Sequence, residues 1–308
     1  MAKHVAVLMG GWSSERPVSL TSGAACADAL EAKGYKVSRI DVTRDLGALL
    51  AALTPRPDVV FNALHGKGGE DGTIQGVLDI LKIPYTHSGL RASAAAMDKP
   101  TAKAIFLAAG LRVPGGRVYA KDEVLAGDVM PRPYVIKPPA EGSSFGVQIV
   151  REGDNGPAVA DWGFGEEVLV EPFIAGRELT VAVIDEPGKG ARALGSIEIR
   201  HEHGFFDYEA KYTGGQAEHI MPPAMHTDAL AEMEAMAVAA HVALGCRGIS
   251  RSDFRYDDTA GEPGGVYLLE VNTQPGMTPV SLVPDAAKAQ GMSFPDLVSW
   301  MVEAARWG

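Results

Sequence analysis

Two short segments near the C-terminal end of the sequence constrain the fold most strongly. GISRSDFRY (248–256) and GVYLLEVN (265–272) flank the loop DDTAGEPG, which is rich in Gly, Asp and Pro. This pattern predicts an antiparallel β-hairpin whose loop is centred near residue 261. Counting outward from that centre places Asp253 roughly opposite Glu270.

The predicted hairpin gathers oxygen-bearing side chains on one face. Side chains two residues apart on a strand point to the same side, so Glu270 and Asn272 share a face, as do Arg251, Asp253 and Arg255. Asp253, Glu270 and Asn272 then offer three oxygen ligands, two of them anionic, which suit Mg²⁺. The alternative is that the two carboxylates pair with Arg251 and Arg255 on a solvated face.

The remaining elements predict a mixed α/β protein with an N-terminal βαβ domain that contains a parallel sheet. Strands are expected over residues 4–9, 35–42, 58–64 and 132–139, two more within 166–184, and helices from about Pro17, over 98–110 and over 226–245. We expect three regions, with boundaries at 1–90 for the N-terminal domain, 91–175 for a central subdomain and 176–308 for a C-terminal subdomain.

Composition excludes several classes of function. The hydrophobic share of 46% is that of a globular protein with a core, and no apolar run approaches the length of a membrane span. The start of the chain lacks the features of a signal peptide. Cys26 and Cys246 lie in Ala-rich segments that predict buried helix, so we expect free thiols in a reducing cytoplasm. The net charge of −11 argues against a nucleic-acid partner.

Candidate phosphate ligands occur in the middle of the chain. In EGSSFGV (141–147), Gly142 and Gly146 bracket two serines, and such small residues let backbone N–H groups approach phosphate oxygens closely. The segment is not a P-loop, because no Gly-Lys-Ser/Thr follows it. Lys137 at a strand end and Lys99 beside a helix N-terminus add two ammonium groups.

A third candidate is the segment VEPFIAGRE (170–178). A strand that stops near Glu171 and restarts near Glu178 exposes backbone donors and acceptors between the two, and Glu178 could hold a ribose hydroxyl. The pattern by itself predicts an ordinary hairpin. Because the same sequence also contains the two lysines, the Gly-Ser segment and the predicted metal face, the segment is also interpreted as a hinge at a nucleotide site.

These parts, in this order, resemble the ATP-grasp enzymes, and five stretches resemble the D-alanine–D-alanine ligase family. The stretches are GGWSSERPVSLTSG (10–23), HGKGGEDG (65–72), KPPAEGSSFGV (137–147), YEAKYTGG (208–215) and LLEVNTQPGMTPVSLVP (268–284). The resemblance implies an ATP-grasp fold and ATP-dependent joining of two D-alanines through an acyl phosphate. The product would be a precursor of peptidoglycan, on which the cell wall and cell shape depend. It further implies ATP and two Mg²⁺ ions, with Mn²⁺ able to substitute, and a cytoplasmic homodimer.

The resemblance also assigns roles to single residues. Glu15 is implied to be the acid that holds the ammonium of the first substrate. Ser143 and Tyr212 are implied to be its hydrogen-bond partners, which close the site. Arg251 and the N–H of Gly276 are implied to stabilise the oxyanion, and these five residues form the catalytic group. The positions implied to contact the amino-acid substrates are His65, Ser281 and Leu282. Those implied to contact ATP are Lys99, Lys137, Ser144, Glu171, Ile174, Glu178, Lys211 and Leu269. The implied metal ligands are Asp253, Glu270 and Asn272.

Two other classes of protein are alternatives to the enzyme that the resemblance implies. The start VAVLMGGWSSE could open a dinucleotide-binding fold of a nicotinamide dehydrogenase, but it lacks the Gly-x-Gly-x-x-Gly spacing and leaves the metal hairpin unexplained. A non-catalytic nucleotide sensor would keep the lysines but could lose Glu15, Arg251 or the metal ligands. The other histidines are expected to be structural or on the surface: His4, His87, His201, His203, His219, His226 and His241.

Overall fold

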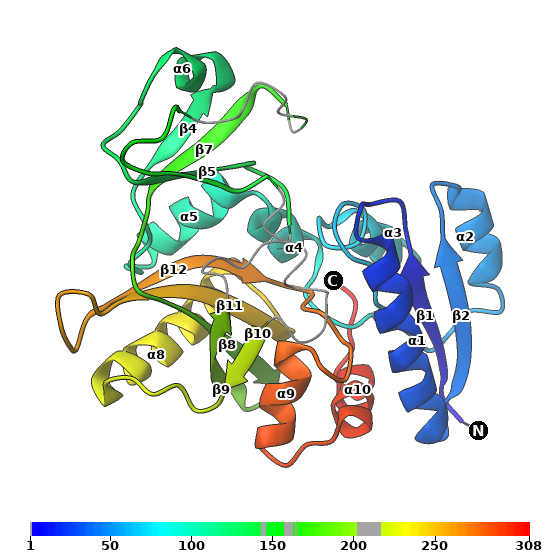
Figure 1. The fold of residues 1–308 in the computed structure, drawn as a ribbon. Helices are drawn as coiled ribbons and strands as arrows, with labels where there is room; N and C mark the ends of the chain where they lie inside the picture. The colour runs from blue at the N-terminus through cyan, green and yellow to red at the C-terminus, as the bar shows by residue number, and fades with distance from the viewer. Residues whose placement is uncertain (1, 143–145, 157–162, 164, 202–216) are drawn as a thin grey trace.

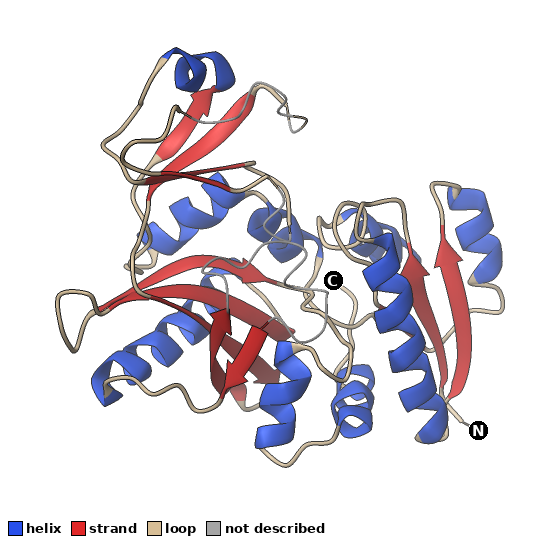
Figure 2. Ribbon diagram, viewed as in Figure 1, coloured by secondary structure: helices blue, strands red, loops and turns tan. Residues whose placement is uncertain are grey.

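The computed structural model describes residues 2–142, 146–156, 163, 165–201 and 217–308. Within these residues the strands form a three-stranded, a four-stranded and a five-stranded sheet. Figure 1 shows the three-stranded sheet on the right, and the four-stranded sheet above the five-stranded sheet on the left. The helices lie against these sheets (Figure 2), which confirms the predicted mixed α/β class.

The N-terminal sheet is parallel, as predicted, with the order β2-β1-β3. Its strands are β1 (His4–Gly10), β2 (Lys36–Val42) and β3 (Val59–Asn62), and the helices around them are α1 (Arg16–Ala32), α2 (Leu46–Ala52) and α3 (Thr73–Leu81). Val5 and Val7 belong to one core cluster and Ala6 and Leu8 to another. Both faces of β1 are therefore buried, which explains why its sequence is continuously apolar.

The four-stranded sheet has the order β4-β7-β5-β6 and is antiparallel. It contains β4 (Arg117–Ala120), β5 (Tyr134–Lys137), β6 (Gln148–Val150) and β7 (Glu167–Pro172), together with α6 (Lys121–Ala126). Before it come α4 (Leu90–Met97) and α5 (Lys99–Ala108). Asp98 caps α5 by accepting a hydrogen bond from the N–H of Thr101, so the helix begins where the sequence predicted it.

The five-stranded sheet has the order β10-β9-β8-β11-β12 and is also antiparallel. Its strands are β8 (Arg177–Glu186), β9 (Gly190–His201), β10 (Ala217–Ile220), β11 (Gly248–Asp257) and β12 (Gly265–Asn272). The helices of this region are α8 (Thr227–Leu244), α9 (Leu282–Ala289) and α10 (Phe294–Glu303). Val181 and Val183 of β8 pack in the cluster that contains α8, whereas Ala182 and Ile184 pack with α9 and α10.

The hairpin of β11 and β12 confirms the predicted register, because Asp253 pairs with Glu270. The register then shifts by one residue, so Phe254 pairs with Leu268 and Leu269 has no partner across the ladder. Such a β-bulge bends the strand and redirects a side chain. As a result, Leu269 and Glu270, although consecutive, both line the same pocket.

The interpretation of VEPFIAGRE as an ordinary hairpin is wrong. β7 pairs with β4 and β5 in the four-stranded sheet, whereas β8 pairs with β9 and β11 in the five-stranded sheet. The turn between them therefore carries the chain from one sheet to the other, which agrees with the interpretation as a hinge. We name residues 173–176 the hinge segment.

Both cysteines are buried and free, as expected. Cys26 lies on α1, but Cys246 lies just after the end of α8, so the prediction of helix is wrong for Cys246. Burial raises the pKa of both thiols. Among the helices that the structure describes, none is long and apolar enough to cross a membrane.

Candidate active site

Two adjoining pockets lie where the sheets meet. The smaller pocket has apolar walls that come from both antiparallel sheets and from the hinge segment, at Val135, Val147, Phe173, Ile174 and Leu269. The larger pocket is a cleft of about 910 Å³ that reaches the beginning of α1. The residues that line both are Lys99, Glu141, Glu178, Asp253 and Glu270. We call these five residues the shared wall.

A buried group of two lysines and one glutamate borders the smaller pocket. Lys137 of β5 places Nζ 2.5 Å from Oε2 of Glu171, and Lys103 of α5 pairs with the other oxygen of the same carboxylate. Burial lowers the pKa of the Lys103 ammonium, although Glu171 opposes this shift. Two cations share one carboxylate, so positive charge is left over beside a cavity that could receive phosphates.

Lys103 is not among the predicted site residues, although the sequence contains a signal for it. Lys103 follows Lys99 by four residues, and residues with this spacing lie on the same face of a helix. Lys99 itself donates a hydrogen bond of 2.5 Å to the carbonyl oxygen of Glu141 and lies 3.4 Å from Oε2 of Glu270. Its ammonium group is therefore held at the shared wall.

Arg255 fixes the hinge segment from the five-stranded sheet. Its Nε donates to the carbonyl oxygen of Ile174 at 3.1 Å and its Nη2 to that of Gly176 at 2.7 Å. Its Nη1 lies 3.9 Å from Oε2 of Glu178, and burial lowers the pKa of the guanidinium. From the sequence, Arg255 is expected only as a partner for Asp253 or Glu270, so this contact with the backbone was not predicted.

Gly176 should be intolerant of a side chain. Its φ is +83°, and a Cβ at this position would lie 2.1 Å from the carbonyl oxygen of Tyr256. We expect Gly176→Ala to destabilise the protein by roughly 3 kcal/mol, because the hinge segment must shift. Gly188→Ala is the matched control, since its φ is +79° and its Cβ would contact nothing within 4 Å. Equal losses of melting temperature in the two variants would contradict the steric argument.

The predicted metal face lies on the shared wall. Asp253 accepts a hydrogen bond from Thr180 Oγ1 at 2.7 Å, and Asn272 Oδ1 accepts one from the N–H of Gln274 at 2.8 Å. Asp253 and Glu270 line both pockets and Asn272 lines the cleft. Two carboxylates and an amide oxygen at a cavity bordered by lysines form a donor set that fits Mg²⁺ together with phosphate oxygens.

The alternative for this hairpin is confirmed in one part and wrong in another. Arg251 does pair with Asp253, through Nε to Oδ1 at 2.8 Å and Nη2 to Oδ2 at 2.7 Å. The face is not a solvated surface, because the side chains of Arg251 and Asp253 are only 15% and 14% exposed and both line the cleft. The two hydrogen bonds to the carboxylate of Asp253 therefore orient the guanidinium of Arg251 inside the cleft.

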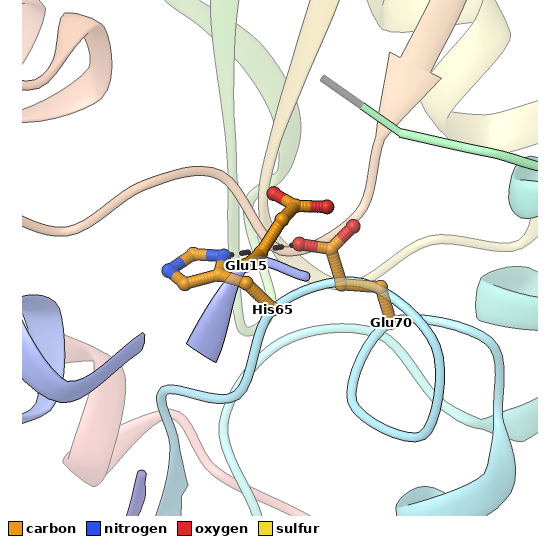
Figure 3. Close-up of side chains that lie close together, drawn as sticks. All are labelled: Glu15, His65 and Glu70. Atoms are coloured by element: carbon orange, nitrogen blue, oxygen red, sulfur yellow. Dashed lines mark hydrogen bonds and ion pairs between the residues drawn. The ribbon is translucent and has the colours of Figure 1, made fainter. Parts of the chain in front are cut away.

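At the far end of the cleft, Glu15, His65 and Glu70 approach one another (Figure 3). One ligand atom from each lies within 4.8 Å of the others. His65 Nδ1 lies 3.0 Å from Glu70 Oε1, and His65 Nε2 lies 3.3 Å from Ser22 Oγ. Two carboxylates with a histidine make a negative, largely buried site that suits an ammonium group. Glu70 lies within the stretch HGKGGEDG but is not among the predicted site residues.

The beginning of α9 forms another side of the cleft. Ser281 is the N-cap residue, and its Oγ lies 3.1 Å from the N–H of Thr278 and 2.8 Å from Oγ1 of the same residue. Gly276 faces it, since a Cβ there would lie 3.2 Å from Ser281 Oγ. Unpaired N–H groups of a first helical turn favour an anion, so this side suits a carboxylate.

Every predicted site residue that the structure describes lines one of the two pockets. The cleft contains Glu15, His65, Arg251, Asn272, Gly276, Ser281 and Leu282, and the smaller pocket contains Lys99, Lys137, Asp253, Glu171, Ile174, Glu178, Leu269 and Glu270. Ser143, Ser144, Lys211 and Tyr212 lie outside the described residues. His219, which was expected to be structural or on the surface, also lines the cleft.

A lysine-bordered cavity between two antiparallel sheets, next to a carboxylate–amide face, defines an ATP-grasp protein. The family model described as D-ala D-ala ligase C-terminus matches residues 122–303, and the one described as D-ala D-ala ligase N-terminus matches residues 46–88. The chain belongs to the D-alanine–D-alanine ligase family. This membership rules out the nicotinamide dehydrogenase and supports the enzyme over the nucleotide sensor.

Individual relatives agree with this assignment. The chain is 56% identical to the D-alanine–D-alanine ligase of Azorhizobium caulinodans and 57% identical to that of Paramagnetospirillum magneticum, with 99% of each chain covered. A crystal structure of D-alanine–D-alanine ligase from Bacillus anthracis complexed with ATP is 30% identical, with a TM-score of 0.78, and covers 98% of this chain and 97% of its own. The VanG D-Ala:D-Ser ligase from Enterococcus faecalis is 29% identical, with a TM-score of 0.79 and 99% coverage of both chains.

Proposed function

We propose that this chain joins two D-alanines to D-alanyl-D-alanine with ATP, through an acyl phosphate of the first D-alanine, as a step toward peptidoglycan. The observation that carries the proposal is the shared wall. Because Lys99, Asp253 and Glu270 line both pockets, a phosphate in the smaller pocket and a carboxylate in the cleft would meet at one place. Transfer of a phosphoryl group needs this positioning and charge neutralisation more than covalent help from the protein.

ATP would occupy the smaller pocket. Its base fits the apolar walls, and Glu178, next to the hinge segment, could accept a hydrogen bond from a ribose hydroxyl. Lys137 and Lys99 border the pocket and supply positive charge for the phosphates. Ser144 and Lys211 are further ATP-contacting positions by resemblance.

Two Mg²⁺ ions would be held by Asp253, Glu270 and Asn272, and Mn²⁺ would be able to replace Mg²⁺. When bound, Mg²⁺ neutralises negative charge on the phosphates of ATP. The carboxylate of Asp253 already holds the guanidinium fork of Arg251, so the same residue would orient a metal and an arginine at the point where the two pockets join.

The cleft would hold the two amino acids. Glu15, with His65 beside it, would receive the ammonium of the first D-alanine, and Ser281 with Leu282 would receive the carboxylate of the second. When the second amine attacks the acyl phosphate, the carbonyl oxygen becomes an oxyanion. Arg251 and the N–H of Gly276 are the donors that would stabilise it.

Phosphate release from ATP is the direct test of this function. We expect release with D-alanine and only background release with L-alanine or with no amino acid, because the cleft must hold the D-configured amine and carboxylate at fixed points. Equal release with both enantiomers would contradict the proposed substrate. The cytoplasmic location and the homodimer remain predictions from the resemblance.

The product should be the dipeptide and not an ester. Relatives that join D-alanine to D-lactate differ from this chain in the stretch that corresponds to EAKY, where they lack the tyrosine, so Tyr212 resembles the peptide-forming type. The uncharged phenol of Tyr212 would complete a hydrogen-bonded lid, whereas a cationic histidine in its place would attract the carboxylate of lactate and repel an incoming ammonium. Given D-alanine and D-lactate together at neutral pH, the enzyme should make D-alanyl-D-alanine with negligible depsipeptide, as identified by mass. Depsipeptide as the major product would overturn the roles given to Tyr212 and to the second substrate.

A further inference from the structure

A histidine–aspartate pair lies in the cleft outside the groups considered above. His219 of β10 places Nδ1 2.7 Å from Oδ2 of Asp285 on α9, and both side chains are 24% exposed. His219 pairs with Ile199 across the sheet, and Ile199 pairs with Glu178. Side chains in one such row point to the same side, so His219 belongs to the face that carries the shared wall.

Asp285 is an anion close to a proposed anion site. Its N–H donates to the carbonyl oxygen of Ser281 at 3.0 Å, so it lies one helical turn beyond the N-cap of α9. Asp285, Ser281 and Leu282 all line the cleft. A free carboxylate at this place would repel the carboxylate of a second D-alanine at Ser281 and Leu282.

We propose that His219 is a positioning residue for the second substrate, because its imidazole holds and screens the Asp285 carboxylate and keeps the α9 end of the cleft receptive to an anion. A carboxylate can only accept a hydrogen bond, so Nδ1 is the donor in this pair. This inference rests on the proposed function, since it concerns the same cleft. It assigns selectivity for a carboxylate-bearing acceptor to two residues beyond Ser281 and Leu282.

A purely structural role for the pair is the competing explanation. The other face of α9 is anchored by Val283, Ala286 and Ala287, which are at most 1% exposed. A partly exposed ion pair adds little stability to a helix that is already packed in this way. Removing His219 should therefore leave the fold intact, while the Asp285 carboxylate in the cleft loses the side-chain hydrogen-bond partner that the described residues give it.

The test uses the full chain and a set of four variants: His219→Ala, His219→Gln, Asp285→Asn and the double variant His219→Ala/Asp285→Asn. Initial rates of dipeptide formation are measured against D-alanine at saturating ATP, and then against ATP at saturating D-alanine. We expect His219→Ala to raise the KM for the second D-alanine on the order of 10-fold, with the KM for ATP unchanged. The double variant should return that KM to within about two-fold of the original chain, because an amide does not repel the substrate.

The remaining variants separate charge from packing. His219→Gln keeps a donor for Asp285 and should raise the KM less than His219→Ala, while Asp285→Asn should leave the KM equal or lower. The matched control is Lys189→Ala, which breaks an exposed 2.7 Å pair with Glu186 at the turn between β8 and β9 and should change neither KM. Melting temperatures of all variants show whether each one folds.

An unchanged KM for D-alanine in His219→Ala would overturn the inference, and so would a double variant no better than His219→Ala. If His219→Ala fails to fold, His219→Gln and Asp285→Asn still test the inference. A raised KM for D-alanine in Asp285→Asn would contradict repulsion between the Asp285 carboxylate and the carboxylate of the second substrate. These failures differ from failure of the proposed function, in which the original chain would make no D-alanyl-D-alanine at all.

Discussion

Glu270→Gln should lower turnover on the order of 10²- to 10³-fold while the fold stays intact. Glu270 pairs across the hairpin with Asp253, lies 3.4 Å from Lys99 and lines both pockets. An amide of the same size removes one anionic ligand, so Mg²⁺ would bind more weakly and the charge of the triphosphate would be less neutralised. Rates measured across a Mg²⁺ titration should show both a lower maximum and a higher half-saturating concentration.

Glu218→Gln is the control for this variant. Glu218 lies on the same five-stranded sheet, but its side chain is 68% exposed, so its change should affect neither value. Circular dichroism and melting temperature would establish that both variants fold. Near-normal activity of Glu270→Gln at millimolar Mg²⁺ would remove the argument for a metal face on this hairpin.

Arg251→Lys should lower the rate of the chemical step on the order of 10²-fold, although the positive charge is kept. Lysine cannot reproduce the planar fork that bonds to both oxygens of Asp253, so the developing oxyanion would lose an oriented donor. ATP binding should barely change, because Arg251 lines the cleft and Lys99 and Lys137 border the smaller pocket. Single-turnover dipeptide formation and nucleotide binding by calorimetry measure the two effects separately.

Arg192→Lys is the control for this substitution, since Arg192 is 51% exposed and pairs with Glu186 at the surface. Because Asp253 is also a proposed metal ligand, the Mg²⁺ dependence of Arg251→Lys should be measured in the same series. If nucleotide affinity falls while single-turnover chemistry survives, Arg251 binds ATP and does not stabilise the oxyanion.

The sequence predicted the hairpin well because its information is local. In an antiparallel pair, the loop fixes which residues face each other, so Asp253 could be placed opposite Glu270 by counting. The face predicted for Arg251, Asp253 and Arg255 is also confirmed, because the alternate residues Ser252, Phe254 and Tyr256 are buried on the other side of the sheet. The bulge beyond Asp253 was not predictable, because a one-residue shift leaves no clear mark in a sequence of this kind.

Features that depend on distant segments were missed or misjudged. The segment VEPFIAGRE resembles a hairpin locally, and only the partners of β7 and β8 show that it joins two sheets. His219 and Asp285 are 66 residues apart, and neither lies in a pattern that points to the other. Lys103 is different, because its spacing from Lys99 was visible and was not used.

The shared wall has a consequence for the design of inhibitors. A single compound could place an aromatic group against Phe173 and Leu269 and a carboxylate near Ser281, with its connecting atoms passing Asp253 and Glu270. Binding of the first group would then raise the effective concentration of the second, so the linked affinity could exceed that of either fragment by 10²- to 10⁴-fold, on the order expected for well-matched tethers. A tether carrying a cation at its middle would also meet the two carboxylates that border the passage.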